Sequence, residues 1–327
     1  MTPGELEELA KGVLGRERRA LAKAITLVES TRADHQEAAQ RLLERLLPST
    51  GNAARVGVSG VPGAGKSTFI EALGLYLIQA GRRVAVLAVD PSSAVSGGSI
   101  LGDKTRMPGL AARDEAFIRP SPAAGALGGV ARHTREALLV CEAAGFDVVL
   151  VETVGVGQSE HLVSSMVDSF LLLALAGAGD ELQGIKRGIL ELVDVIAINK
   201  ADGEGLARAE RTAAEYKSAL RLLRGDDAPW VPRVTTLSAL EARGVDGVWS
   251  LLEEHRRFLE QTGRLAERRR AQQKTWLSSL VRETLEAELW ESPVVQQAAP
   301  EIEALVGSGA ITPTEGARRL LAVFRSR

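Results

Sequence analysis

The sequence GVPGAGKS, residues Gly60–Ser67, has the spacing G-x-x-x-x-G-K-[ST]. A short β-branched run at 54–59 precedes it, and residues 68–73 follow with the apolar spacing of a helix. Strand, glycine loop and helix together are the context in which this pattern cradles phosphates. Glycines let successive backbone N–H groups point into one concavity, and the helix start adds its positive dipole end. The sequence therefore predicts a phosphate-binding loop rather than an ordinary glycine loop on an α/β sheet.

Two side chains of this loop carry the expected chemistry. Lys66 is expected to reach the β- and γ-phosphates, and the hydroxyl of Ser67 is expected to ligate Mg²⁺. The residues expected to hold the nucleotide here are Gly60, Val61, Pro62, Gly63, Ala64, Gly65, Lys66, Ser67 and Thr68.

Strand-like and helix-like segments alternate from residue 53 to about 260, which predicts an α/β fold with a doubly wound, mostly parallel sheet. The expected strands are Arg55–Ser59, Val84–Val89, Ala116–Arg119, Val148–Val151, Ser169–Ala174, Val195–Asn199 and Arg233–Thr236. Helical patterns precede and follow this core. We therefore expect an N-terminal helical extension at 1–50, a nucleotide-binding domain at 51–262 and a C-terminal helical arm at 263–327.

Composition narrows the class of protein. The 327 residues are 45% hydrophobic and 25% charged, as in an ordinary globular protein, and the net charge of −2 favours neither nucleic acid nor an anionic membrane as partner. The single cysteine, Cys141, lies in a helical pattern and is expected to be a buried thiol in a reducing compartment. Residues 1–8 are acidic without an apolar signal core, and the apolar run 170–178 is too short to span a bilayer. These features predict a cytoplasmic location.

One charged run has two interpretations. The basic cluster at 264–270 is able to contact an acidic partner, but such runs are more often a solvated helix face, and we expect the latter. Further on, Thr312 is expected to cap a helix that has Pro313 at its first position and Glu315 closing a capping box.

Carboxylates follow two of the predicted strands, and ligands of such sheets bind at the carboxyl ends of strands. Asp90 ends the second strand, where it is placed to hold a magnesium-bound water or to orient the attacking one. Glu152 follows four apolar residues of the fourth strand, the layout of a Walker B segment, and Gly155 is expected to offer its N–H to the γ-phosphate. Asp103, in a glycine- and serine-rich stretch, is a further candidate for metal or phosphate sensing. The expected metal ligands are Ser67, Asp90, Asp103 and Glu152.

The sixth predicted strand ends in Asn199-Lys200-Ala201-Asp202, the N-K-x-D pattern, about 130 residues after the phosphate loop. A carboxylate such as Asp202 accepts hydrogen bonds from the N1–H and the 2-amino group of guanine, and adenine offers neither in that arrangement. The stem of Lys200 is able to lie along the base plane. After the last strand, Ser238, Ala239 and Leu240 fit the S-A-[KL] loop whose backbone touches guanine O6. The sequence therefore favours GTP over ATP.

A glycine-rich segment, Gly177–Lys186, follows a central strand and should reach the nucleotide edge. Gln183 or Lys186 is placed to approach the phosphates when this segment closes, and a plain connection with Lys186 in solvent is the equal alternative.

Together these motifs resemble the MeaB/ArgK family of P-loop GTPases, whose human counterpart is the methylmalonic aciduria type A protein. The resemblance rests on Gly60–Ser67, Asp90-Pro91, 152–155 and 199–202, and with the flanking helices it covers essentially the whole chain. It implies a GTPase, with GTP as substrate and GDP as product, that chaperones adenosylcobalamin-dependent methylmalonyl-CoA mutase, gating cofactor loading and protecting the mutase. It also implies that the mutase stimulates hydrolysis and that the terminal helices hold a homodimer. By the same resemblance 177–186 is a third switch segment, which favours Lys186 as a catalytic residue.

Val156 stands directly after Gly155, where a Ras-like GTPase would carry a water-positioning glutamine. We therefore expect slow intrinsic hydrolysis that accelerates when a partner orders the switch segments. Two alternatives stay open: a GTPase for nickel insertion into a metalloenzyme, although the histidines are scattered, and a P-loop small-molecule kinase with Asp90 as base. A purely structural adaptor would leave the triphosphate and metal motifs unexplained.

Overall fold

The computed structural model describes residues 1–89, 106–120, 127–153, 159–176, 187–225 and 228–326. Its chain divides into two compact units, the first reaching Arg269 and the second beginning at Arg270. The first unit holds the sheet and most of the helices, and the second is helical.

Seven strands form one sheet in the order β3-β2-β4-β1-β5-β6-β7, and every neighbouring pair is parallel. The predicted doubly wound, mostly parallel sheet is confirmed, and each expected strand is present within two residues of its predicted bounds. Gly60, Thr153 and Asn199 end three of these strands, so they meet at one edge of the sheet. The strands are β1 Ala54–Gly60, β2 Val84–Val89, β3 Ala116–Arg119, β4 Val148–Thr153, β5 Ser169–Leu175, β6 Val195–Asn199 and β7 Arg233–Thr236.

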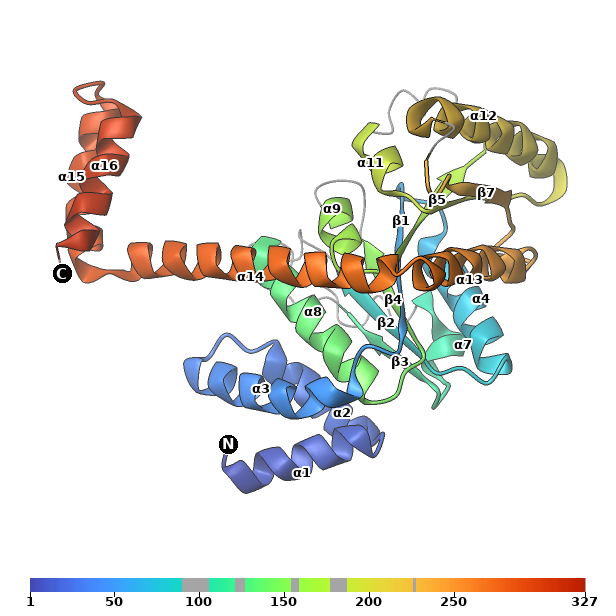
Figure 1. The fold of residues 1–327 in the computed structure, drawn as a ribbon, viewed down its shortest axis with the longest axis horizontal. Helices are drawn as coiled ribbons and strands as arrows, with labels where there is room; N and C mark the ends of the chain where they lie inside the picture. The colour runs from blue at the N-terminus through green and yellow to red at the C-terminus, as the bar shows by residue number, and fades with distance from the viewer. Residues whose placement is uncertain (90–105, 121–126, 154–158, 177–186, 226–227, 327) are drawn as a thin grey trace. The chain divides into compact units, whose positions relative to one another are not determined.

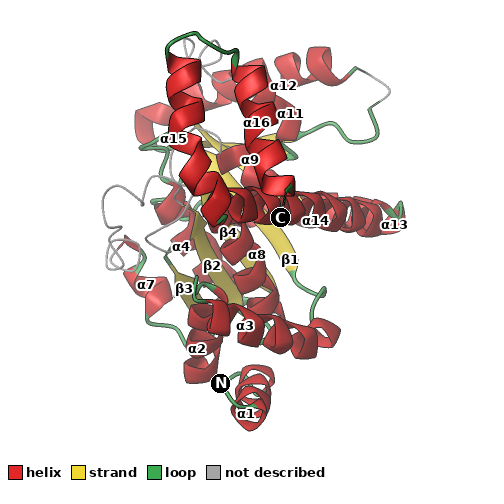
Figure 2. Ribbon diagram, turned by 90° about the vertical axis from the view of Figure 1, so that its left-hand side faces the viewer, coloured by secondary structure: helices red, strands yellow, loops and turns green. Residues whose placement is uncertain are grey.

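Helices cover both faces of the sheet (Figure 2). Successive strand residues alternate between two cores: Val148 and Leu150 pack with one set of helices, and Val149 and Val151 pack with the other. Because both faces are buried, the strands are apolar throughout rather than alternating with polar residues. The first set comprises α4 Lys66–Gln79, α7 Pro108–Ala111 and α13 Val245–Gln261; the second comprises α8 Leu127–Ala143, α9 Ser159–Ser164, α11 Arg187–Leu192 and α12 Leu206–Arg224.

Three N-terminal helices and a short 3-10 turn pack against α8 (Figure 1). Their apolar faces, including Leu6, Ile25 and Leu42, are fully buried and belong to the same core as the strand residues beneath α8. The elements are α1 Pro3–Leu14, α2 Arg18–Val28, α3 Ala33–Leu46 and η1 Leu47–Ser49. On α8, Cys141 is buried as expected, and burial raises the pKa of its thiol.

The second unit contains the greater part of α14 Arg264–Glu291, followed by α15 Pro293–Gly307 and α16 Pro313–Arg325. Helices α15 and α16 pack closely, because Gly316 leaves no side chain against Val306. The predicted cap is present: the Oγ1 of Thr312 accepts from the backbone N–H of Glu315 at 3.2 Å. The reciprocal bond of a capping box is absent from the described contacts of Glu315, whose carboxylate pairs instead with Arg318 and Arg319.

The expectation of a solvated face at 264–270 is wrong for Arg268 and Arg269, which lie in the first unit and turn inward. Arg269 donates Nε and Nη2 to the two carboxylate oxygens of Asp168 at 2.8 and 2.7 Å. Asp168, directly before β5, also accepts from the backbone N–H of Arg55 in β1. Arg268 lies 3.4 Å from Asp194, the residue before β6. The first turns of α14 are thus fastened to the amino ends of three central strands, which a charge run alone does not reveal.

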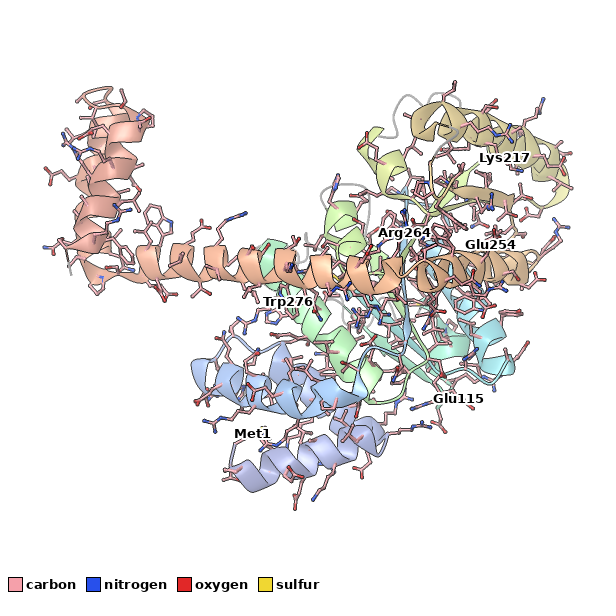
Figure 3. All side chains as sticks on the ribbon, in the orientation of Figure 1. Met1, Glu115, Lys217, Glu254, Arg264 and Trp276 are labelled. Carbon is pink, nitrogen blue, oxygen red and sulfur yellow. The ribbon has the colours of Figure 1, made fainter. Side chains whose placement is uncertain are left out.

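Replacement of Asp168 by alanine tests this fastening. The Asp168 side chain is 2% exposed, so its loss leaves the half-buried Arg269 guanidinium without its carboxylate. We therefore expect Asp168→Ala to destabilise the protein by about 3 kcal/mol. The matched control is Glu254→Ala, because Glu254 lies on α13 (Figure 3) and pairs with Arg233 at the surface. That pair should contribute less than about 1 kcal/mol. Urea unfolding followed by circular dichroism measures both; equal losses would contradict the inward role of Arg269.

Candidate functional site

The glycines of the loop 60–67 are required by its shape. A side chain at Gly60 would collide with the carbonyl oxygen of Leu173 on the neighbouring strand β5. Gly63 and Gly65 have φ values of +81° and +85°, in the left-handed region that other residues rarely adopt. The loop therefore turns sharply from β1 into α4, as a phosphate cradle must.

Lys66 begins α4 and points back over the loop. Its Nζ donates to the carbonyl oxygens of Gly60 at 2.7 Å and Val61 at 3.3 Å. Burial lowers the pKa of the Lys66 ammonium, while the carboxylates of Glu152 and Glu160 act in the opposite direction. Gly65, at the N-cap position of α4, has no side chain to cap the helix, and the N–H groups of a first helical turn are suited to bind anions.

The hydroxyl of Ser67 lies against the carboxylate at the end of β4. Its Oγ donates to Oε1 of Glu152 at 3.2 Å, and Glu152 is buried. Behind them, Thr153 donates from Oγ1 to Oγ of Ser59 at 3.0 Å, which joins the ends of β4 and β1. A hydroxyl and a carboxylate, both hard oxygen donors, therefore stand side by side next to the ammonium of Lys66.

The other expected residues of the phosphate region cannot be placed in the same way. Asp90, Asp103, Gly155, Gln183 and Lys186 lie outside the described residues.

Asn199 ties the phosphate loop to the loop after β7. Its Nδ2 donates to the carbonyl oxygen of Ala64 at 2.7 Å, and its Oδ1 accepts from the backbone N–H of Ala239 at 3.0 Å. The side chain is 2% exposed. A Cβ on Gly65 would lie 2.6 Å from the same Nδ2, so the glycine makes room for this amide. The N-K-x-D pattern predicts Asn199 as a nucleotide contact, but it does not predict that the Asn199 side chain joins the phosphate loop to the loop after β7.

The segment after Asn199 holds the candidate base-recognising carboxylate. Asp202 is half-buried and accepts at Oδ2 from the Ser238 hydroxyl at 2.6 Å. Lys200 is exposed and has φ +60°, an uncommon value for a lysine, and the short turn η2 Gly203–Gly205 follows. Leu240 is 83% exposed beside the buried Ala239. The structure therefore brings Asn199, Asp202, Ser238 and Ala239 together at the carboxyl end of β6.

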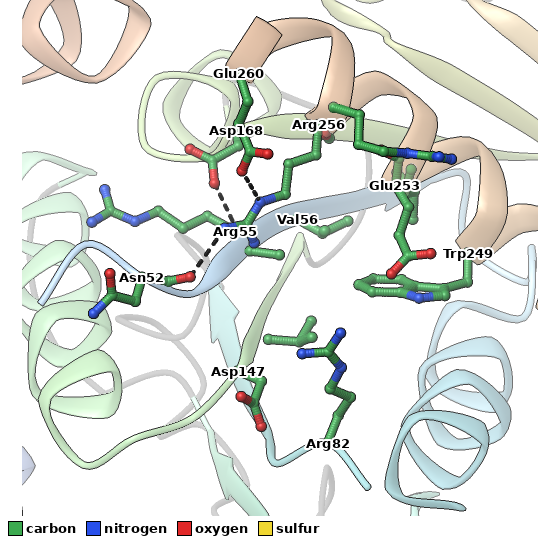
Figure 4. Close-up of a pocket in the computed structure, with 15 residues that line it drawn as sticks. Asn52, Arg55, Val56, Arg82, Asp147, Asp168, Trp249, Glu253, Arg256 and Glu260 are labelled. Atoms are coloured by element: carbon green, nitrogen blue, oxygen red, sulfur yellow. Dashed lines mark hydrogen bonds and ion pairs between the residues drawn. The ribbon is translucent and has the colours of Figure 1, made fainter. Parts of the chain in front are cut away.

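A separate cavity of about 470 Å³ lies at the opposite end of the strands (Figure 4). It is lined by residues at the amino ends of β1 and β4 and by α13, among them Arg55, Arg82, Asp147, Trp249 and Glu253. Gly60 lies six positions after Ala54 along β1, a span of about 20 Å. This cavity is therefore distinct from the phosphate loop.

No three histidine, cysteine, aspartate or glutamate side chains gather as a metal-binding group in the part of the chain that the structure describes. No helix described here is both long and apolar enough to cross a membrane.

The parallel sheet, the glycine cradle with Lys66 and the Asn199–Asp202 segment define the class of a P-loop nucleotide-binding protein. Comparison with known proteins specifies the family. Residues 21–294 match the model of the methylmalonyl-CoA mutase-associated GTPase MeaB, and the chain belongs to this family.

Similar proteins extend the match over nearly the whole chain. A probable GTPase of Mycobacterium tuberculosis is 55% identical over 318 residues, covering 97% of this chain and 95% of that protein. The mitochondrial methylmalonic aciduria type A homolog of Mus musculus is 47% identical over 335 residues, covering 98% and 80%. A crystal structure of a LAO/AO transport system kinase superposes with a TM-score of 0.80 at 40% identity, covering 99% of each chain.

Substitution of Gly65 tests whether the position of the Asn199 amide depends on the absence of a side chain at residue 65. Gly65→Ala should carry the strain of a positive φ, about 1 kcal/mol, and should also displace Asn199. We expect at least a tenfold loss of affinity for GDP in calorimetric titration, because both loops lose their shared partner.

Gly81→Ala is the matched control. Gly81 has φ +77° and nothing within 4 Å of the added Cβ, so it carries the strain without the clash. Its thermal stability should fall while GDP affinity stays that of the wild type; a similar loss of affinity in both variants would contradict the role of Asn199.

Proposed function

We propose that the protein hydrolyses GTP to GDP and phosphate in a magnesium-dependent reaction. The observation that carries the proposal is the meeting, at one edge of the sheet, of Lys66 and Ser67 in a glycine cradle with Glu152 and with the Asn199–Asp202 segment. Relatives that are 55% and 48% identical to this chain are named GTPases, which supports the same activity here.

The oxygen atoms of the phosphate region suit Mg²⁺, which prefers hard oxygen ligands. Ser67 and Glu152, whose side chains touch, would hold the ion together with the nucleotide phosphates, and Asp90 and Asp103 are proposed as further ligands or as partners of its waters. When bound, the ion neutralises charge that develops on the transferred phosphoryl group.

Several groups of the chain are proposed to bind the phosphates. The partly desolvated ammonium of Lys66 exchanges its two carbonyl partners for phosphate oxygens and stabilises their negative charge. Backbone N–H groups of residues 60–68 bind the remaining oxygens. The γ-phosphate is proposed to be approached further by the N–H of Gly155 and, when 177–186 closes, by Lys186 or Gln183.

Asp202 is proposed to recognise guanine. One of its oxygens already accepts from Ser238, and a carboxylate has about four lone-pair positions, so acceptors remain for N1–H and the 2-amino group. Lys200 is exposed and free to lie over the base, and the backbone of Ser238, Ala239 and Leu240 is proposed to contact O6.

The proposed biological role is that of a chaperone of adenosylcobalamin-dependent methylmalonyl-CoA mutase. The name of the matching family and that of the 47% identical mouse protein support it. We further propose slow intrinsic turnover that the mutase stimulates, because Val156 replaces a water-positioning glutamine. The proposed location is the cytoplasm, in keeping with one buried cysteine.

A homodimer through the arm 263–327 belongs to the same proposal. On α14, Leu277, Val281 and Leu285 recur every four residues and are 50–63% exposed, which gives one apolar stripe along the helix. Such a stripe is suited to bind the same stripe of a second copy.

A kinase reaction is the second candidate, since the structure at 40% identity is named a kinase. The two reactions differ in the fate of the γ-phosphate. With γ-labelled GTP, hydrolysis releases label as free phosphate, whereas a kinase transfers it to an acceptor.

Labelled-GTP turnover also tests the phosphate site. We expect slow release of free phosphate by the wild type, at least tenfold faster release with added mutase, and no detectable release by Lys66→Ala, because the cradle loses its cation. Lys217→Ala, a change on the exposed face of α12, is the control and should turn over as the wild type does. Retained turnover by Lys66→Ala would show that the cradle is misassigned, and brisk turnover without mutase would contradict partner gating.

Base selection is tested by Asp202→Asn. The substitution replaces two acceptor oxygens by one acceptor and one donor, so GTP should bind at least a hundredfold more weakly. Xanthosine triphosphate presents O2 in place of the amino group, so its affinity should rise. Calorimetric titration of both nucleotides into both proteins measures the exchange. An unchanged preference for guanine would remove Asp202 from the site.

A further inference from the structure

Arg243 joins the two loops on which the candidate guanine site is built. Its backbone N–H and carbonyl pair with the carbonyl and N–H of Ser238, each at 3.0 Å, which closes the loop after β7 as a small antiparallel bridge. Its guanidinium crosses to the other loop, where Nη2 donates to the carbonyl oxygen of Ala201. Nη1 lies 3.4 Å from the carboxylate of Glu241.

Both loops hold backbone conformations that need such support. Arg16, Lys200 and Ala242 are the residues other than glycine with positive φ in the described chain, and Lys200 and Ala242 belong to these loops. Conformations of this kind cost free energy and persist where surrounding contacts impose them. Ala242 precedes Arg243, and Lys200 precedes Ala201, whose carbonyl oxygen accepts from Arg243, so Arg243 contacts both strained turns.

The peptide groups beside Asp202 are held from two sides. The N–H of Ala201 donates to the carbonyl oxygen of Leu237 at 3.0 Å, and its carbonyl accepts from Arg243. That carbonyl shares a peptide plane with the N–H and the Cα of Asp202, so fixing it also fixes the point at which the Asp202 side chain leaves the backbone. The Ser238 hydroxyl then completes the placement by donating to the carboxylate.

We propose that Arg243 is a positioning residue for base recognition: it sets the Asp202 carboxylate for the two donors of guanine without touching the base itself. The inference rests on the proposed recognition of guanine by Asp202. It predicts that Arg243 controls selectivity between purines that differ in the 2-amino group, because a displaced carboxylate no longer accepts from both N1–H and the 2-amino group.

An arginine suits this position better than a lysine. The planar guanidinium reaches the Ala201 carbonyl and the Glu241 carboxylate with different nitrogens at once, whereas an ammonium is a single centre of charge on a flexible stem. The Arg243 side chain is 55% exposed, so its removal opens no cavity in the core, and the variants are expected to fold.

The test compares GDP with IDP, which keeps N1–H but lacks the 2-amino group. In calorimetric titrations Arg243→Ala should weaken GDP about tenfold and IDP less than threefold, so that the preference for GDP falls. Arg243→Lys should lie between Arg243→Ala and the wild type. Arg233→Ala is the control, because Arg233 makes a surface ion pair at the amino end of β7 and carries the same charge; it should leave both affinities unchanged.

Several outcomes decide the matter. An unchanged ratio of GDP to IDP affinity in Arg243→Ala, or an equal loss for both nucleotides, would overturn the positioning role and show at most a structural one. If Arg243→Ala fails to fold by circular dichroism, the ratio in Arg243→Lys decides in the same way. A wild-type protein without preference for GDP over IDP would overturn the guanine assignment of Asp202 itself, and this inference with it.

Discussion

The side-chain amide of Asn199 is the constraint on which the candidate site depends. It is buried at the end of β6, and its donor and its acceptor are both used, one on the phosphate loop and one on the loop after β7. An unpaired amide at this depth would cost roughly 1–3 kcal/mol, so the two loops cannot separate cheaply. Glycine at position 65 leaves room for the Asn199 amide. The course of the chain after β7 brings the Ala239 N–H to the Oδ1 of this amide.

The phosphate half of the site is organised around charge rather than packing. The Lys66 ammonium is partly buried, and the charges of Glu152 and Glu160 favour its protonated form. It donates to two carbonyl oxygens. Carbonyl oxygens are weaker partners for a cation than phosphate oxygens are, so the proposed exchange of these partners for the phosphates of a nucleotide would be favourable. The Ser67 hydroxyl, donating to Glu152, is likewise arranged next to a group that binds cations. The cradle is therefore preorganised for a charged ligand, which limits the reorganisation that binding requires.

Much of this could be predicted from the sequence, and the reasons are local. Strands such as Val84–Val89 and Val195–Asn199 were predicted to the residue, because apolar runs bounded by turn residues are local signals. Glu152 and Asn199 were expected at strand ends for the same reason, and the glycine motif predicted that Lys66 and Ser67 close the loop after the first strand. Contacts between distant segments could not be predicted from the sequence. Arg243 belongs to no recognised motif, and the charge run at Arg268 and Arg269 is typical of a solvated helix face. Their partners lie 42 to 101 residues away, so no spacing rule connects them.

The inward arginines of α14 fix the amino ends of strands whose carboxyl ends form the candidate site. Asp168 and Asp194 precede β5 and β6, and each accepts from a backbone N–H of the neighbouring strand as well as from an arginine. A buried ion pair contributes little net stability compared with apolar packing, but it enforces one geometry, since any shift leaves a charge without its partner. Strands β1, β5 and β6 are held in register by these contacts at their amino ends, while their carboxyl ends carry Gly60, Leu173 and Asn199 at the phosphate loop. A site that must place hydrogen-bonding groups within about half an ångström requires a frame fixed at both ends.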